Sequence, residues 1–292
     1  MLTLEGAIDI HVHSSPEVFG RIGDAVEIAK RCEAAGMRAV VFKAHHEGTT
    51  TRAYHANREL RNLTALGGLV LNDFVGGINP VAVKAALDQG AKIIWAPTMH
   101  SKHHEETFGG RGTYGIKRQT DEGTIARPGI EVLDARGALS PALVQVLELV
   151  EARGAVFATA HFSPAEIDAV VTGYASRMKI LINHPFFLPR TMPMAWYVQM
   201  AELGAHLELC ANICQPMAFH QGGGMLLQQA VDLINGAGVG QCVVATDAGQ
   251  PYSPWPDEEL RAFMNCLYDV GLTETDIRRV MVENPARLLG LD

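Results

Sequence analysis

Eight short apolar runs recur along the chain, and a segment with helical periodicity follows most of them. The runs lie at residues 7–12, 38–44, 67–73, 91–97, 154–160, 178–183, 205–211 and 240–246. The helical segments lie at residues 24–36, 80–90, 140–154, 163–177, 194–204, 224–238 and 256–271. Runs that are apolar on both faces and alternate with helices indicate parallel strands. The chain therefore reads as repeated β/α units.

Eight such units in 292 residues predict a closed (β/α)8 TIM barrel of the α/β class. We expect residues 1–292 to form one barrel domain. The alternative is an open, doubly wound sheet, which would need a glycine-rich phosphate-binding turn after the first strand. That turn reads HVHSSP and contains no GxGxxG pattern, so the sequence favours the barrel.

A long insertion, residues 99–139, separates the fourth strand from its helix. It is too long for an ordinary connection, so we expect a lid over the carboxyl ends of the strands, with a small hairpin inside it. It carries charged and aromatic side chains that would suit a small polar or anionic substrate: Phe108, Arg111, Tyr114, Lys117 and Arg118.

Polar side chains stand where several of these strands end. His11 and His13 close the first run, and side chains two residues apart on a strand point to the same side, about 7 Å apart along the backbone. His161, His184 and Asp247 follow the fifth, sixth and eighth runs. The carboxyl ends of barrel strands share one rim, where barrel enzymes place catalytic groups. Imidazoles and a carboxylate on that rim predict a site for zinc or another first-row divalent ion.

This arrangement resembles the amidohydrolase superfamily of metal-dependent barrel hydrolases. The resemblance rests on the HxH pair, the histidines after the fifth and sixth strands, the aspartate after the eighth, and ENPARLLGL at residues 283–291, which is similar to the closing helix of that superfamily. It implies that His11, His13, His161, His184 and Asp247 bind metal, zinc first, with manganese, iron or nickel as alternatives.

The chain departs from the superfamily at the fourth strand, where two-metal members carry a bridging lysine or glutamate. That strand ends IWAPTMH, and the nearest substitute is Lys43 at the end of the second strand. A buried lysine is costly unless it is paired or modified. We expect Lys43 to be a carbamylated metal ligand or a cation facing substrate, and otherwise a lysine that reaches out from the rim. One or two ions per chain remain open.

Other polar residues near the rim are weaker candidates. We expect His45, His100, Asn212 and Gln250 to contact substrate. One of His45 and His46 is expected to face the rim and bind substrate or metal, and the other to pack outward. His100, His103 and His104 form either a solvated cluster or a second metal or substrate contact, and His220 is a candidate to reach the rim. His55 and His206 are expected to be structural.

Such a site favours hydrolysis, since a divalent ion lowers the pKa of bound water toward about 7 and polarises a carbonyl. Asp247 would then act as the proton acceptor and donor, and His184 or Lys43 would stabilise the oxyanion. We expect an amide, lactone or related ester as substrate. The alternatives are a single-metal decarboxylase or hydratase of a small carboxylic acid, and a non-catalytic ligand-binding barrel.

Composition narrows the class of partner. The formal charge is −8, which disfavours nucleic acids and anionic membranes as partners. The five cysteines form no CxxC pair, and no apolar run approaches the roughly 18 residues of a membrane span. We therefore expect a cytoplasmic enzyme with a small-molecule substrate, and leave open whether it forms a homo-oligomer.

Overall fold

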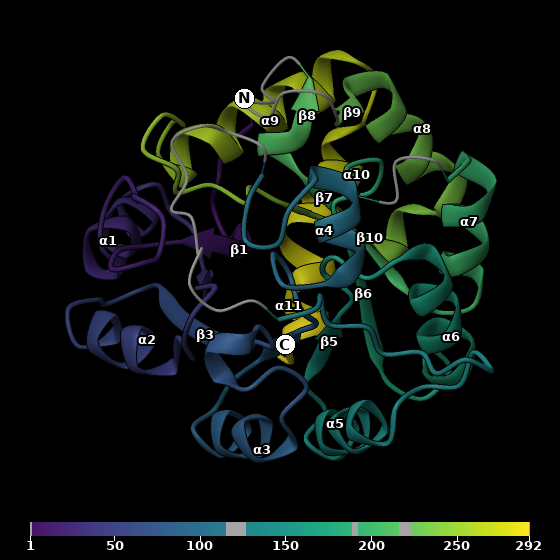
Figure 1. Ribbon diagram of the computed structural model, residues 1–292. Coiled ribbons are helices and arrows are strands. Elements are labelled where there is room, and N and C mark those ends of the chain that lie inside the picture. Colours follow the sequence, from purple (N-terminus) through teal and green to yellow (C-terminus); the bar gives the residue numbers. More distant parts are fainter. Residues whose placement is uncertain (1, 115–126, 189–191, 216–223, 292) are drawn as a thin grey trace.

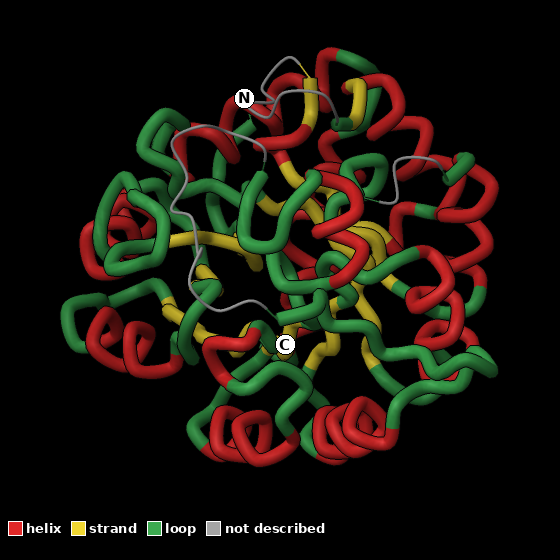
Figure 2. Tube along the Cα trace, viewed as in Figure 1, coloured by secondary structure: helices red, strands yellow, loops and turns green. Residues whose placement is uncertain are grey.

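Eight parallel strands form a barrel that is surrounded by helices (Figures 1 and 2). The computed structural model describes residues 2–114, 127–188, 192–215 and 224–291. The barrel strands, in their order around the sheet, are β1 (Ile8–His13), β2 (Ala39–Lys43), β3 (Thr64–Val70), β4 (Ile93–Trp95), β5 (Val156–Ala158), β6 (Lys179–Asn183), β7 (His206–Cys210) and β10 (Cys242–Ala245). The predicted (β/α)8 barrel is confirmed.

The barrel closes where β1 meets the residues that follow β10. Val12 pairs in parallel with Ala248, and the His13 amide donates a 2.8 Å hydrogen bond to the Ala248 carbonyl. The Asp247 amide donates a 2.9 Å hydrogen bond to the His11 carbonyl. The backbone that closes the barrel, which we call the seam, therefore brings the HxH pair beside the aspartate that follows β10.

Helices cover the outside of the strands, and Figure 1 shows most of them as an outer ring. They are α1 (Ala25–Ala34), α2 (Thr50–Asn57), α3 (Pro80–Asp88), α5 (Pro141–Ala152), α6 (Pro164–Tyr174), α7 (Met194–Glu202), α8 (Leu227–Ala237), α9 (Pro256–Asp269), α10 (Glu274–Arg278) and α11 (Asn284–Leu289). The last of these is the closing helix expected at residues 283–291. None of the described helices is long and apolar enough to cross a membrane.

Some element boundaries differ from the prediction. β3 begins at Thr64, three residues before the expected start at Gly67, so the glycine pair lies inside the strand. A Cβ atom on Gly68 would lie 2.2 Å from the Ile93 carbonyl oxygen, so β4 approaches too closely for any side chain there. Short strands β8 (Cys214–Gln215) and β9 (Met225–Leu226) pair before α8, which starts three residues later than expected.

The insertion after β4 contains helix α4 (Lys102–Phe108) in its described part. Leu133 and Leu139 form one isolated antiparallel pair further along it. Lys117 and Arg118 lie outside the described residues, as does His220. The imidazole of His104 on α4 stacks on His161, which follows β5, so this helix lies at the carboxyl ends of the strands.

Candidate metal centre

Two imidazoles converge on one carboxylate at the seam. The Nε2 atoms of His11 and His13 lie 3.0 Å and 3.1 Å from the same oxygen, Oδ1 of Asp247. Both histidines are buried, and the Asp247 side chain is 14 % exposed. The two histidines are side by side on β1 as the sequence predicted, and the seam supplies the aspartate.

Unusual backbone conformations hold two of the predicted ligands. Asp247 has φ +55° and His184 has φ +37°, in the left-handed region that non-glycine residues rarely adopt. The side-chain amides of Asn212 and Gln250 donate hydrogen bonds of 2.7 Å and 2.9 Å to the Asp247 carbonyl. These two residues, which we expected to contact substrate, thus fix the turn that presents Asp247.

Each histidine of the HxH pair also has a buried carboxylate behind it. Nδ1 of His11 lies 3.2 Å from Oε2 of Glu208, and Nδ1 of His13 lies 3.7 Å from Oε2 of Glu17. Metal-binding histidines in proteins commonly donate the second ring N–H to such a group, which leaves the Nε2 lone pair for the ion, and the His11–Glu208 pair has this geometry. Nδ1 of His13 instead accepts a 3.1 Å hydrogen bond from Nη2 of Arg21. Sequence reasoning missed both glutamates, although a charged residue inside the apolar run AHLELCA was a usable signal for Glu208.

Lys43 places a cationic group in the middle of the centre. Its Nζ lies 2.9 Å from Nε2 of His11 and 5.5 Å from the centroid of the Trp95 ring, and it interacts electrostatically with Asp247 and Glu208. Burial lowers the pKa of the Lys43 ammonium from its ordinary value. Asp247 and Glu208 act in the opposite direction and favour the charged form, but burial outweighs them.

The protonation states of three of the predicted histidine ligands suit metal ligation. His11 differs, because burial lowers its pKa but Asp247 and Glu208 outweigh burial and raise it above its ordinary value. Burial lowers the pKa of His184 to about 3, and burial together with Arg21 lowers that of His13 to about 3. Burial also lowers the pKa of His161 well below its usual value. Burial acts the other way on Asp247, but His11 and His13 outweigh it and hold the pKa of this carboxyl well below its ordinary range. These three imidazoles are therefore neutral and the carboxylate ionised, the forms that bind a cation.

The other two predicted histidine ligands lie on the neighbouring strand ends. The His184 ring centroid is 5.9 Å from that of His11 and 5.2 Å from that of His161. Nδ1 of His184 is buried and has no hydrogen-bond partner among the described residues. Nδ1 of His161 lies 2.8 Å from Nδ1 of His104. His184 is thus next to the HxH pair. His161 lies on the far side of His184, in contact with His104, which sequence reasoning left unassigned.

Glu17 joins several side chains on the other side of His13. Its carboxylate lies 2.8 Å from Nδ1 of His45 and 3.3 Å from Nδ1 of His46, and it pairs with Arg21. The His45 ring stacks on that of His13 at 4.9 Å. His13, Glu17 and His45 therefore form a second compact group next to the centre, whose ligand-type atoms lie within 4.8 Å of one another.

The remaining histidine candidates lie elsewhere. Nδ1 of His100 accepts a 3.0 Å hydrogen bond from the Asp73 amide, and its ring lies 4.8 Å from that of Phe74. Both partners belong to the short helix η1 (Asp73–Val75), so His100 faces the end of β3 rather than the seam. His206 begins β7 and His55 lies on α2, the places expected for structural residues.

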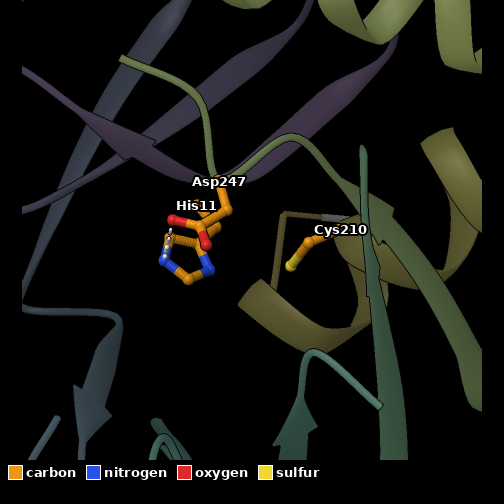
Figure 3. Close-up of side chains that lie close together, drawn as sticks. All are labelled: His11, Cys210 and Asp247. Atoms are coloured by element: carbon orange, nitrogen blue, oxygen red, sulfur yellow. Dashed lines mark ion pairs between the residues drawn. The ribbon is translucent and has the colours of Figure 1, made fainter. Parts of the chain in front are cut away.

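The donor set at the seam fits a first-row divalent ion. The ligand-type atoms of His11, Asp247 and Cys210 all lie within 4.8 Å of one another, and Figure 3 shows their side chains close together. Imidazole nitrogen, carboxylate oxygen and thiol sulfur are the ligands that zinc takes in proteins. Nζ of Lys43 lies 2.9 Å from Nε2 of His11, so this side chain borders the same donor set.

The family comparison covers most of the barrel. A family model described as "Family of unknown function (DUF6282)" matches residues 6–208, more than two thirds of the chain. The chain belongs to the DUF6282 family. The matched region includes His11, His13 and Glu208, and it ends before Asp247. A comparison with curated proteins found no match.

Solved structures share the fold over nearly the whole chain. An amidohydrolase from Pseudomonas aeruginosa is 13% identical with a TM-score of 0.61, covering 97% of this chain and 95% of that chain. A dihydroxybenzoic acid decarboxylase from Polaromonas, solved with manganese and 2-nitroresorcinol, is 12% identical with a TM-score of 0.58, covering 98% and 97%. A probable 2-pyrone-4,6-dicarboxylic acid hydrolase from Acinetobacter baumannii, with citric acid bound, is 12% identical with a TM-score of 0.55, covering 98% and 99%.

These structures are amidohydrolase-superfamily enzymes, and they include both hydrolases and decarboxylases. The resemblance drawn from the strand-end residues is therefore confirmed at the level of the fold.

Proposed function

We propose that this protein is a metal-dependent hydrolase that acts on a small amide, lactone or related ester. The observation that carries the proposal is the convergence of His11 Nε2 and His13 Nε2 on one oxygen of Asp247, at 3.0 Å and 3.1 Å. These two histidines and the aspartate come from both sides of the seam and are buried or nearly so. Their donor atoms are of the kinds found in catalytic metal sites. Zinc fits this donor set best, and the hydrolases among the structures of similar fold support the reaction class.

His11, His13 and Asp247 would hold the ion, with His184 and His161 on the adjacent strand ends as further ligands. When bound, the ion supplies Lewis acidity and lowers the pKa of a coordinated water. Asp247 is ionised, so its carboxylate accepts the proton of the attacking water and returns it to the leaving group. Lys43 would donate a hydrogen bond to the developing oxyanion, and His184, whose Nδ1 has no partner among the described residues, would take that role in place of ligation.

A single-metal decarboxylase of a small carboxylic acid is the second candidate. β4 ends at Trp95, and the four residues that follow it, Ala96 to Met99, include no lysine or carboxylate that could bridge two ions. One ion is then enough, and the similar fold of a dihydroxybenzoic acid decarboxylase supports this alternative. In that reaction Lys43 would pair with the substrate carboxylate.

A substrate panel separates the two reactions. Protein freed of metal and reloaded with zinc or manganese is incubated with amides, lactones and small aromatic acids, and both hydrolysis and carbon dioxide release are measured. We expect zinc-dependent hydrolysis, and Asp247→Asn to lower kcat by about 100-fold or more while leaving the fold intact. Asp232→Asn on the outer helix α8 is the matched control. Carbon dioxide release without hydrolysis would favour the decarboxylase, and full activity of Asp247→Asn would refute the role of this residue.

A further inference from the structure

Cys210 ends β7 and faces the same space as the HxH pair. Its side chain is fully buried, and its Sγ lies within 4.8 Å of ligand-type atoms of both His11 and Asp247. Figure 3 shows the sulfur turned from β7 toward the His11 ring. A thiol therefore stands beside the centre, where the sequence offered only a buried cysteine.

The strand geometry fixes this placement. Glu208 and Cys210 lie two residues apart on β7, so their side chains point to the same side of the sheet. Glu208 reaches Nδ1 of His11, and Cys210 lies one step closer to the carboxyl end of the strand. Its backbone is in register with Ala245 of β10, two residues before Asp247. Cys210 thus approaches the centre from the strand next to the one that leads to Asp247.

The surroundings of Cys210 differ from those of the other buried cysteines. Among the described residues, two groups have ligand-type atoms close enough to hold an ion, and Cys210 is the only cysteine in either. Its Sγ–H donates a weak 3.6 Å hydrogen bond to Oε2 of Glu208. Phe187, Leu188 and Ile213 pack around it. These apolar side chains limit the access of water to the sulfur. The polar groups next to the sulfur are then those of the candidate metal centre.

We propose that the Cys210 thiolate is a ligand of the metal ion that the proposed function requires. On binding, the Sγ–H bond breaks, an Sγ–metal bond forms and the proton is released to solvent. With His11 and Asp247, the other two members of its group, it would make a site of one nitrogen, one oxygen and one sulfur that leaves a position open for water. A thiolate favours zinc, iron(II) or cobalt(II) over manganese or magnesium, which prefer oxygen ligands. This inference rests on the proposed function, because it needs an ion at the seam.

Cobalt(II) substitution tests the inference by absorption spectroscopy, independently of activity. The full chain, freed of metal, is titrated with cobalt(II), and we expect a near-ultraviolet sulfur-to-cobalt charge-transfer band together with the visible d–d bands. Cys210→Ser should lose the charge-transfer band and keep the d–d bands. Cys214→Ser, a change at a buried cysteine outside the group, should keep both. Cys210→Ser should also weaken zinc binding more than manganese binding.

Two results would overturn the inference, and they differ in what they say about function. Visible cobalt bands without the charge-transfer band in the wild-type protein would exclude Cys210 as a ligand and leave the proposed function standing. Failure of the wild-type protein to bind cobalt(II), zinc or manganese would overturn both. Because the deciding spectrum is that of the wild-type protein, the test does not depend on the folding of the Cys210→Ser variant.

Discussion

Nδ1 of His11 lies 3.2 Å from Oε2 of Glu208, a carboxylate that is fully buried inside the barrel. Burial alone would raise the pKa of Glu208, but the neighbouring His11 lowers it below its ordinary value. An ionised acceptor at this position keeps the proton on Nδ1 and turns Nε2 toward Asp247. The pair therefore orients His11 in the way that the proposed metal ligand requires.

Replacing this acceptor should weaken metal binding. Glu208→Gln removes the negative charge behind His11 and should reduce zinc affinity by about 10- to 100-fold, measured by competition with a chromophoric chelator. Glu166→Gln is the control, because Glu166 is also buried but lies away from His11. Its carboxylate accepts hydrogen bonds from the backbone amides of Val132 and of Ser163, the residue before α6. Glu166→Gln should lower stability and leave zinc affinity unchanged. Equal affinities for the wild-type protein and Glu208→Gln would refute the positioning role.

Metal removal should lower thermal stability. An ion that binds only the folded chain adds about 2.7 kcal/mol to the free energy of unfolding at 100 times its Kd. We expect zinc to raise the Tm of the metal-free protein in a concentration-dependent way, followed by calorimetry. A variant carrying both His11→Ala and His13→Ala should show no such rise. An equal rise in that variant would place the stabilising ion elsewhere.

The residues at strand ends could be predicted from sequence, and those in connections could not. His11, His13 and Asp247 follow from the alternation of strands and helices, because that pattern fixes which residues reach the common rim. Glu17 lies in the connection after β1, whose path periodicity does not determine. His104 lies in the long insertion after β4, so its position could not be predicted for the same reason.

Of two further residues near the centre, only Glu208 had a usable signal in the sequence. Glu208 and Cys210 share one strand and one face, and a charged residue in an apolar run was the signal for the former. Cys210 carried no signal of its own, because a cysteine in a core strand is ordinarily a small apolar side chain.

Gly249 should be indispensable at the seam. It has φ +122°, and a Cβ atom there would lie 2.2 Å from the His13 carbonyl oxygen. Gly249→Ala should therefore lower the free energy of unfolding by at least about 1–3 kcal/mol and weaken metal binding, as measured by urea denaturation and zinc titration. Gly240→Ala, where a Cβ meets no atom within 4 Å, is the matched control. Similar small effects at both positions would contradict this account of the seam.

Glu259 on α9 should make stability depend on pH. It is buried, and neither carboxylate oxygen has a hydrogen-bond partner among the described residues. Burial, with Asp9 and Asp247 nearby, raises the pKa of Glu259 from 4.5 to about 9. The folded state therefore holds this proton more tightly than the unfolded state. Its contribution to the free energy of unfolding falls by about 1.4 kcal/mol per pH unit as pH rises between those two values.

Glu259→Gln removes that titration. Relative to the wild-type protein, the variant should become progressively more stable from pH 5 to pH 8.5, measured by urea denaturation at each pH. Asp257→Asn, two residues away on the same helix and paired with Arg31, provides a control for general charge effects. Wild-type and Glu259→Gln stabilities that run parallel across this range would show that Glu259 is ionised in the folded protein.

The seam has a consequence for how the protein matures. Its donors come from β1, which the ribosome makes first among the barrel strands, and from the residues after β10, which it makes last. A nascent chain that still lacks β10 offers the HxH pair without Asp247. The proposed ion would therefore be loaded late in biogenesis, and a chain found with that ion after purification would have assembled the complete ring.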